Sequence, residues 1–178
     1  MSRLLGCLVL IGGLTAGCAS VPKSTAKRNA LDAQAQETLQ EMTANDASLQ
    51  PLLDQAAAYV VFPSIAQGGF IVGGAGGNGV VYEGGRVVGY AQLSQAAIGA
   101  LAGGQKYGEL IIFRDKWAFD KARSSSFDVG GQASAVIIRA GAATETSFNE
   151  KGLAVFIHPI GGAMVNASLT GQTIKFKM

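Results

Sequence analysis

The chain has 178 residues, of which 48% are hydrophobic and 15% are charged, and its formal net charge is +2. A charge so close to balance argues against bulk electrostatic binding to nucleic acid. Glycine is abundant, with 25 residues, whereas only two cysteines occur. The length allows one domain with its own hydrophobic core.

The first 17 residues have the parts of an export signal, with positive charge at Arg3 and an apolar run from Leu4 to Leu14. This run is shorter than the roughly 20 apolar residues of a permanent membrane-spanning helix. The sequence Leu14-Thr15-Ala16-Gly17-Cys18 resembles a lipobox, although leucine is usual where Thr15 stands. We therefore expect residues 1–17 to be removed and Cys18 to carry a covalent diacylglycerol and an acyl chain. The alternative is an ordinary cleaved signal that ends near a cysteine.

Lipidation of Cys18 would decide both the location and the thiol chemistry of the protein. Ala19 follows the cysteine in place of the aspartate that signals inner-membrane retention, so we expect the outer membrane, facing the periplasm, in a Gram-negative cell. Cys7 would leave with the signal and Cys18 would be acylated. The mature chain would then keep no thiol for a disulfide, a metal site or nucleophilic catalysis.

Residues 18–29 are polar and basic and are expected to form a tether, followed by a single domain over residues 30–178. Apolar and small residues then recur at helical spacing. They are Leu31, Ala35, Thr38, Leu39, Met42, Leu49, Leu52, Leu53 and Ala56. This pattern predicts two helices, broken near Asn45-Asp46, with Ser48 or Asp46 capping the second.

After Ala57 the sequence changes to short apolar runs separated by glycine, which are typical of strands. The runs are Tyr59–Phe62 (ended by Pro63), Phe70–Val72, Gly79–Tyr82, Arg86–Leu93, Glu109–Phe113, Ala133–Arg139, Leu153–Ile157, Ala163–Leu169 and Thr173–Met178. Glu83-Gly84-Gly85 is a turn signal between two of them. One short helix is predicted over residues 115–123, with Asp115 as its N-cap.

Two charge-free stretches, Gln55–Tyr82 and Val87–Gln105, have the length of membrane spans. Gly69, Gly73 and Gly77 also recur every four residues, the spacing at which membrane helices approach closely. A helix so rich in glycine would lose about 1 kcal/mol per glycine relative to alanine. We therefore favour strands for these stretches and keep glycine-rich membrane helices as the alternative.

The motifs of common active sites are missing from the sequence. His158 is the sole histidine and has no nearby cysteine or carboxylate, so it predicts a hydrogen-bonded strand end rather than a metal ligand. The run Gly73–Gly77 lacks the Lys-Ser/Thr of a phosphate-binding loop. No pair of carboxylates has a spacing that indicates acid and base. We expect no catalysis, no metal and no cofactor.

The predicted helix at 115–123 carries the candidate lipid-binding residues. Lys116, Lys121 and Arg123 share it with Trp117 and Phe119, a combination suited to anionic head groups and the membrane interface. The alternative is a solvated helix face above an ordinary core contact.

Several glycine-rich blocks, in order and spacing, resemble the SYLF family over roughly residues 50–175. They are Ala57–Ile65, Gly68–Val81, Ala97–Gln105, Glu109–Phe113, the helix ending near Arg123, Phe127–Ser134 and Lys151–Ala154. Eukaryotic members of that family bind phosphoinositides and, in fungi, actin, and bacterial members include exported lipoproteins. The resemblance implies lipid binding here, whereas an exported protein meets no actin.

We therefore predict an α+β fold: N-terminal helices packed on a bent antiparallel β-sheet or barrel-like roll, with one short inserted helix. The expected function is a non-enzymatic, membrane-anchored envelope lipoprotein whose partner is membrane phospholipid. One alternative is a structural envelope lipoprotein that contacts an unidentified protein through its Gly-rich sheet. Another is a carrier with an internal apolar pocket.

Overall fold

The computed structural model describes residues 20–69, 72–98, 105–124, 127–128, 136–139, 148–161 and 172–178. Two helices come first, α1 (Thr25–Asn45) and α2 (Leu49–Gln55). A run of four strands follows, β1 (Ala58–Gly69), β2 (Val72–Glu83), β3 (Arg86–Ile98) and β4 (Gln105–Phe113). The remaining elements are α3 (Lys116–Arg123), β5 (Phe127–Asp128), β6 (Val136–Arg139), β7 (Leu153–Gly161) and β8 (Gln172–Lys177).

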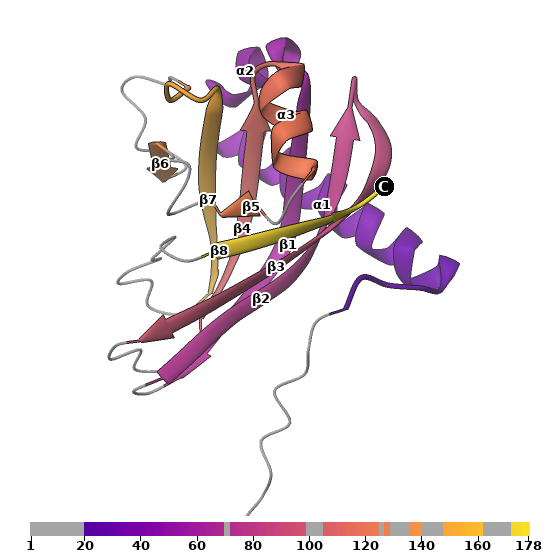
Figure 1. Ribbon diagram of the computed structural model, residues 1–178, viewed down its shortest axis with the longest axis vertical. Coiled ribbons are helices and arrows are strands. Elements are labelled where there is room, and N and C mark those ends of the chain that lie inside the picture. Colours follow the sequence, from indigo (N-terminus) through magenta and orange to yellow (C-terminus); the bar gives the residue numbers. More distant parts are fainter. Residues whose placement is uncertain are drawn as a thin grey trace, which may run out of the picture.

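All described strands belong to one sheet, in the order β5-β8-β3-β2-β1-β4-β7-β6. Neighbouring strands are antiparallel except for β6 and β7, which are parallel. The sheet is strongly bent, because the strands change direction from the upright β7 and β4 to the oblique β3 and β8 (Figure 1). The described strands do not close into a barrel. The expected α+β fold, with N-terminal helices on a bent antiparallel sheet and a short inserted helix, is confirmed.

α1 and α2 cover one face of the sheet. Leu31, Ala35 and Met42 of α1 and Leu49 and Leu52 of α2 are buried against this face. The sheet contributes Val61, Val80, Tyr82, Leu110, Ile112, Ala154 and Phe156. Side chains alternate between the two faces of a strand, so the intervening residues of the same strands face the other way.

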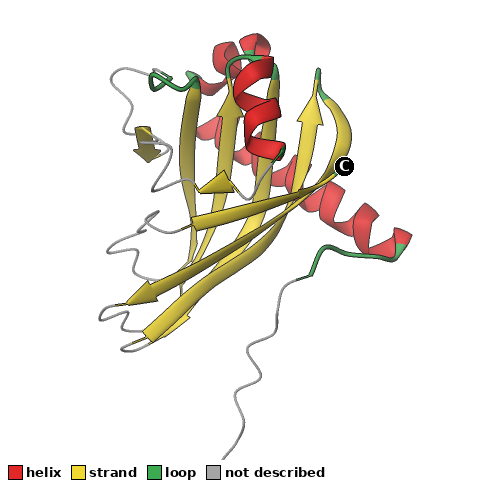
Figure 2. Ribbon diagram, viewed as in Figure 1, coloured by secondary structure: helices red, strands yellow, loops and turns green. Residues whose placement is uncertain are grey.

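α3 lies on the opposite face of the sheet, in front of it in the view of Figure 2. Its buried residues, Ala118, Phe119 and Ala122, pack against a second apolar cluster. The sheet residues of this cluster include Val60, Phe62, Val81, Leu93, Ile111, Phe113, Val155 and Ile174. The domain is therefore layered, with helix, sheet and helix in succession.

The two predicted N-terminal helices and the break between them are confirmed, as is the short helix after Asp115. α1 ends at Asn45, as expected, and Ser48 is the N-cap residue of α2. The Ser48 side chain makes no capping bond; instead, Asp46 Oδ1 accepts a hydrogen bond from Ser48 N at 3.0 Å. Both glycines of the predicted turn have positive φ, 54° at Gly84 and 74° at Gly85, as a tight two-residue hairpin turn requires.

Strands β1 to β4 and β7 are longer than the apolar runs that predicted them. β1 continues through the buried Pro63, which the sequence suggested as its end, because the register shifts between Val61 and Ser64. A bulge of this kind accommodates a residue that lacks an N–H donor. The glycines from 73 to 79 lie inside β2 and not in a helix. Residues 70–71 and the predicted strand Ala163–Leu169 lie outside the described residues.

The first helix starts earlier than residue 30. Thr25 to Asn29 belong to α1, and Val21 is only 4% exposed. Residues 20–29 of the expected tether therefore lie in or against the domain. Among the described helices, none is long and apolar enough to cross a membrane.

Candidate lipid-binding surface

α3 is held in place by its N-cap and by three inward side chains. Asp115 Oδ1 accepts a hydrogen bond from Ala118 N at 2.9 Å, which satisfies one of the free donors of the first turn. Phe119 is buried, with its ring centroid 5.4 Å from that of Phe113 and 5.9 Å from that of Phe176. Phe113 belongs to β4 and Phe176 to β8, so Phe119 links α3 to both of these strands.

The outward side of α3 gathers all four residues that the sequence proposed for lipid contact. Trp117 is 64% exposed, the most exposed large hydrophobic residue of the described chain. Lys121 Nζ lies 4.8 Å from the centre of the Trp117 ring, within the range of a cation–π contact. Lys116 and Arg123 are exposed on the same helix. An exposed indole beside mobile cations matches the composition of membrane-surface helices.

Asp120 pairs with two of these cations. Its Oδ1 lies 3.0 Å from Lys116 Nζ and 2.8 Å from Arg123 Nε. The hydrogen bond from Lys116 lowers the pKa of the Asp120 carboxyl, and the charge of Arg123 acts in the same direction. All three side chains are substantially exposed, and exposed ion pairs of this kind are weak. Lys116 and Arg123 can therefore leave Asp120 for a stronger anion at little cost.

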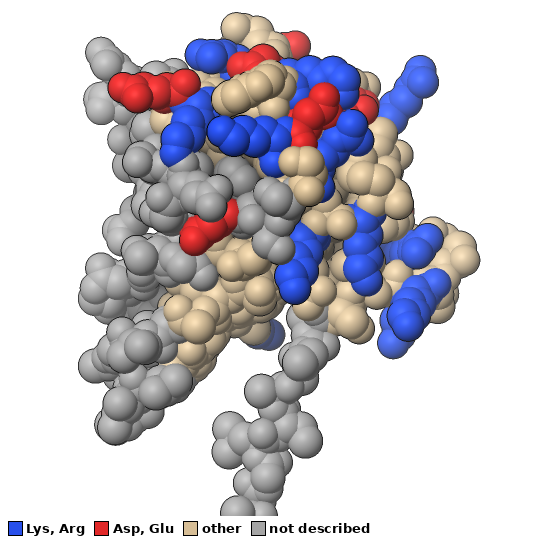
Figure 3. All heavy atoms as spheres, viewed as in Figure 1, with Lys and Arg blue, Asp and Glu red and all other residues tan. Residues whose placement is uncertain are grey.

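Blue spheres gather at the upper end of the face seen in Figure 3, with red spheres among them, and further blue spheres lie at its right. Arg114 extends this area at the start of the helix, with its Nη2 3.5 Å from Asp115 Oδ2. We call Arg114, Lys116, Trp117, Lys121 and Arg123 the α3 surface. Cations clustered on a protein surface raise the local concentration of anionic ligands.

A buried polar cluster lies on the same face of the sheet as α3. Glu109 of β4 and Gln172 of β8 are both 0% exposed. Gln172 Nε2 donates to Glu109 Oε2 at 3.1 Å and to Tyr107 Oη at 3.2 Å. Among the described residues, Glu109 Oε1 and Gln172 Oε1 have no hydrogen-bond partner.

Burial controls the protonation of this cluster. It raises the pKa of Glu109 to about 8, although the hydrogen bond from Gln172 acts in the opposite direction. Burial also raises the pKa of Tyr107, and the neighbouring Glu109 adds to this rise. A carboxyl in such surroundings holds a proton at neutral pH. The sequence analysis missed Glu109, although its alternation with Tyr107, Ile111 and Phe113 places it on the buried face.

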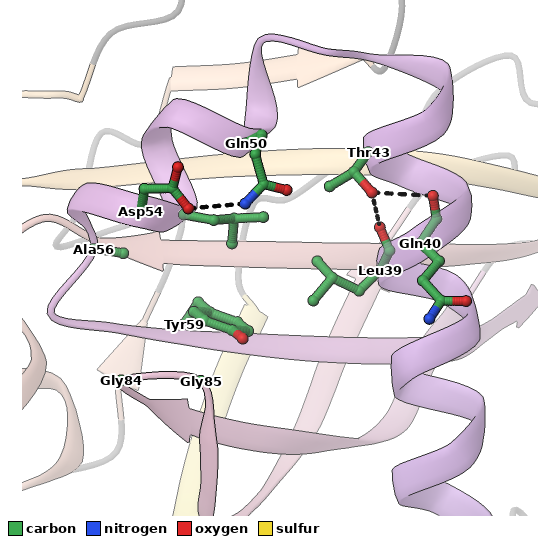
Figure 4. A pocket seen from close by; sticks show the side chains of 10 residues that line it. Leu39, Gln40, Thr43, Gln50, Asp54, Ala56, Tyr59, Gly84 and Gly85 are labelled. Atoms are coloured by element: carbon green, nitrogen blue, oxygen red, sulfur yellow. Dashed lines mark hydrogen bonds between the residues drawn. The ribbon is translucent and has the colours of Figure 1, made fainter.

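A pocket of about 430 Å³ opens on the α1 side of the domain (Figure 4). α1 and α2 line it with Leu39, Gln40, Thr43, Gln50, Leu53 and Asp54, and Ala56, Tyr59, Gly84 and Gly85 complete it. Gln50 Nε2 donates to Asp54 Oδ1 at 2.8 Å, and the Thr43 hydroxyl donates to backbone oxygens of its own helix. The polar groups of the pocket are therefore largely engaged with each other, and its lining mixes polar and apolar side chains.

The remaining sequence candidates have clear positions. His158 lies in β7, with its Nε2 3.4 Å from Glu41 Oε2 of α1. The described residues contain no group of three or more His, Cys, Asp or Glu side chains that could hold a metal ion. Cys18 falls outside the described residues, which begin at Ser20 on the α1 side of the sheet.

Comparison with known proteins adds no family assignment. No protein-family model matches the chain, and no curated protein matches it significantly. Inferences about function therefore depend on the residues themselves and on the geometry of the α3 surface.

Proposed function

We propose that the protein is a non-enzymatic lipoprotein of the bacterial cell envelope, lipid-anchored at Cys18, whose SYLF-like domain binds phospholipid through the α3 surface. The observation that carries this proposal is the exposure of Trp117 beside Lys121, whose Nζ lies 4.8 Å from the ring centre. An indole inserts at the boundary between head groups and acyl chains, while lysine and arginine attract anionic lipid from the water side.

The structural support is that the buried and the exposed residues of α3 lie on opposite sides of the helix. Ala118, Phe119 and Ala122 pack into the core, whereas Trp117 and the basic side chains of α3 are exposed. α3 has two aromatic residues, Trp117 and Phe119. Phe119 is buried, so Trp117 is the one that a lipid can reach. The proposed location is the outer membrane, with the domain in the periplasm, as the sequence around Cys18 and Ala19 suggests.

Vesicle flotation of the unacylated mature chain, residues 18–178 with Cys18→Ser, tests the lipid-binding part. We expect the protein to float with phosphatidylglycerol vesicles at low salt and to be released at high salt, since exposed charges are screened. Replacing Trp117 by Ala and Lys121 by Glu together should abolish flotation. Failure of the unsubstituted chain to bind anionic vesicles at low salt would refute lipid binding.

Two substitutions away from α3 serve as controls. One removes an exposed apolar side chain, as Trp117→Ala does, and the other reverses a positive charge, as Lys121→Glu does. Ile160 is 47% exposed on β7, and Lys106 is exposed on β4. Ile160→Ala and Lys106→Glu should leave flotation unchanged. If Lys106→Glu weakens binding as much as Lys121→Glu does, attraction depends on net charge alone and the α3 surface is not the site.

Processing in cells tests the lipid anchor separately. Cys18→Ser in the full chain should leave an uncleaved precursor, because the thiol that receives the diacylglycerol is gone. Unchanged processing of this variant would contradict lipidation.

The alternative of protein contacts through the Gly-rich sheet has weaker support. A Cβ added to Gly77 would lie 2.7 Å from Ser64 O, and one added to Gly79 would lie 2.7 Å from the Phe62 ring. Both glycines therefore serve packing within the domain. Cross-linking in intact cells that trapped one protein partner and no lipid would favour this alternative.

A further inference from the structure

We propose that the domain is two-sided: its α1 face lies against the membrane that holds the Cys18 lipid, and the α3 surface binds a second, anionic membrane. This inference rests on the proposed function, since it assumes both lipidation of Cys18 and lipid binding by α3. It adds that the two membrane contacts are made on opposite faces of the sheet.

The first step is that the chain before α1 is docked and does not swing freely. Val21 is 4% exposed. Asn78 Nδ2 of β2 donates to Ser20 O at 3.3 Å, and Arg28 Nε donates to Pro22 O at 3.0 Å. Asn78 alternates with Val80 and Tyr82, which pack under α1 and α2. Residues 20–22 therefore dock on the α1 face of the sheet.

The second step is the short distance from this docked segment to the lipid. Only Ala19 stands between Cys18 and Ser20, and an extended chain spans at most about 3.5 Å per residue, or about 7 Å in total. The bilayer that takes up the Cys18 acyl chains must therefore lie close to Ser20. Lys23, Lys27 and Arg28 are exposed beside this point, where cations favour an anionic bilayer surface.

The third step is the position of α3. Its Ala118, Phe119 and Ala122 pack on the face opposite to the one that α1 covers. Figure 1 shows α3 at the top and in front of the sheet, whereas the described chain begins lower down, near the start of α1. A helix is about 10 Å across, so the α1 layer and the sheet exceed the reach of Cys18 and Ala19. While Ser20 and Val21 stay docked, the α3 surface points away from the anchoring membrane.

Trp117 is the only tryptophan of the chain, so its fluorescence reports which membrane α3 enters. The acylated protein is inserted into preformed vesicles and mixed with a second population made of phosphatidylethanolamine and phosphatidylglycerol. Brominated phospholipid, which quenches tryptophan on contact, is placed in one population at a time. We expect a blue shift of the emission whenever the second population is present, and quenching only when that population is the brominated one. Quenching by the anchoring vesicles alone would overturn the two-sided arrangement.

Vesicle capture adds an independent readout. Immobilised anchoring vesicles should retain the second population when they carry the acylated protein. Trp117→Ala combined with Lys121→Glu should lose this capture, while the protein stays anchored and Lys106→Glu captures normally. Capture that survives the α3 substitutions would overturn the proposal, because another surface would then make the second contact.

A long Gly-Ser insertion between Ala19 and Ser20 tests the role of the short connection. The insertion should let α3 turn to its own bilayer, so that the anchoring vesicles now quench Trp117 and capture of the second population falls. An unchanged quenching pattern would show that the docked segment does not set the orientation. Flotation of the unacylated chain distinguishes failure of the proposed function from failure of the two-sided arrangement. If flotation fails, lipid binding itself is wrong. If flotation succeeds while vesicle capture fails, only the two-sided arrangement is wrong.

Discussion

Glu109 makes the stability of the domain depend on pH. Its carboxyl is completely buried, and burial raises its pKa from 4.5 to about 8. Between these values the folded protein keeps a proton that the unfolded chain releases, so the free energy of unfolding falls as the pH rises. Each pKa unit corresponds to about 1.4 kcal/mol, and the loss between pH 5 and pH 8 amounts to a few kcal/mol.

Glu109→Gln should remove most of this pH dependence. The amide keeps the shape of the side chain and has no charged form, so we expect the variant to be more stable than the unsubstituted protein above pH 8. Chemical denaturation at pH 5 and pH 9 measures both free energies of unfolding. Glu150→Gln, at an exposed position, should preserve the pH dependence. Equal stability of the unsubstituted protein at the two pH values would contradict the prediction.

Part of this cluster is predictable from sequence and part is not. The alternation of β4 places Glu109 on the buried side together with Tyr107. Gln172, however, lies 63 positions further along the chain, and only the pairing of β8 with β3 brings it there. Local patterns carry no information on a contact of this range. The sequence therefore could not distinguish Glu109 from the other carboxylates as the partner of Gln172.

Gly79 of β2 is required because the Phe62 ring, at the bulge of the neighbouring β1, fills the space that a side chain would need. A Cβ at position 79 would meet three atoms of the buried Phe62 ring at 2.7 to 3.0 Å. Gly79→Ala should therefore force the ring out of place and destabilise the protein by about 1–3 kcal/mol. Thermal denaturation measures the effect. Gly68→Ala is the matched control, because a Cβ there would meet nothing within 4 Å. Equal melting temperatures for the two variants would contradict this account.

Helices were easier to predict than strands for a physical reason. Asp115 and the break near Asn45-Asp46 are local signals, since capping depends on residues three or four positions apart. The strands β1 and β2 contain Pro63 and the glycines from 73 to 79, which have poor intrinsic β propensity. They form because cross-strand partners and the bulge at residues 61–64 accommodate them, and these features are not local.

On α3, Asp120 limits the charge available to a ligand. Asp120→Asn should release Lys116 and Arg123 and raise the local charge by one unit. Because one charge near an anionic bilayer is worth about 1 kcal/mol, we expect roughly fivefold tighter binding to phosphatidylglycerol vesicles at low salt. Sedimentation of vesicle-bound protein measures the affinity. Glu37→Gln, an equal charge change at an exposed position of α1, should have a much smaller effect; equal gains would indicate that only net charge matters.

At the scale of the whole molecule, the segment before α1 contributes to stability. Val21→Ala should lower the free energy of unfolding by about 1–2 kcal/mol, because buried methyl groups are lost. Val87→Ala is the matched control at a position that is 41% exposed, and its effect should stay within about 0.5 kcal/mol. Denaturant unfolding of the two variants measures both values. A Val21→Ala variant as stable as the control would contradict docking of this segment.

The sequence identified four of the five residues of the α3 surface, all but Arg114, but not where this surface lies relative to the chain before α1. Trp117 and its three basic neighbours follow from one helix, which the sequence predicts well. That α1 and α3 occupy opposite faces depends on which strand residues each helix covers. A polar, basic segment such as residues 18–29 also gives no sign that Val21 will be buried.

The position of β8 imposes an order on folding. This strand lies between β5 and β3, where Gln92 pairs with Lys175, and its Ile174 belongs to the cluster under α3. Burial of this face therefore needs contacts between residues of long sequence separation, which are expected to slow folding. Ile174→Ala should therefore slow or prevent refolding while Lys175→Ala, on the exposed side, leaves the rate unchanged, as stopped-flow fluorescence of Trp117 would show. A chain that completes its core late stays unfolded longer, and the export proposed for this protein would need such an interval for threading through a channel.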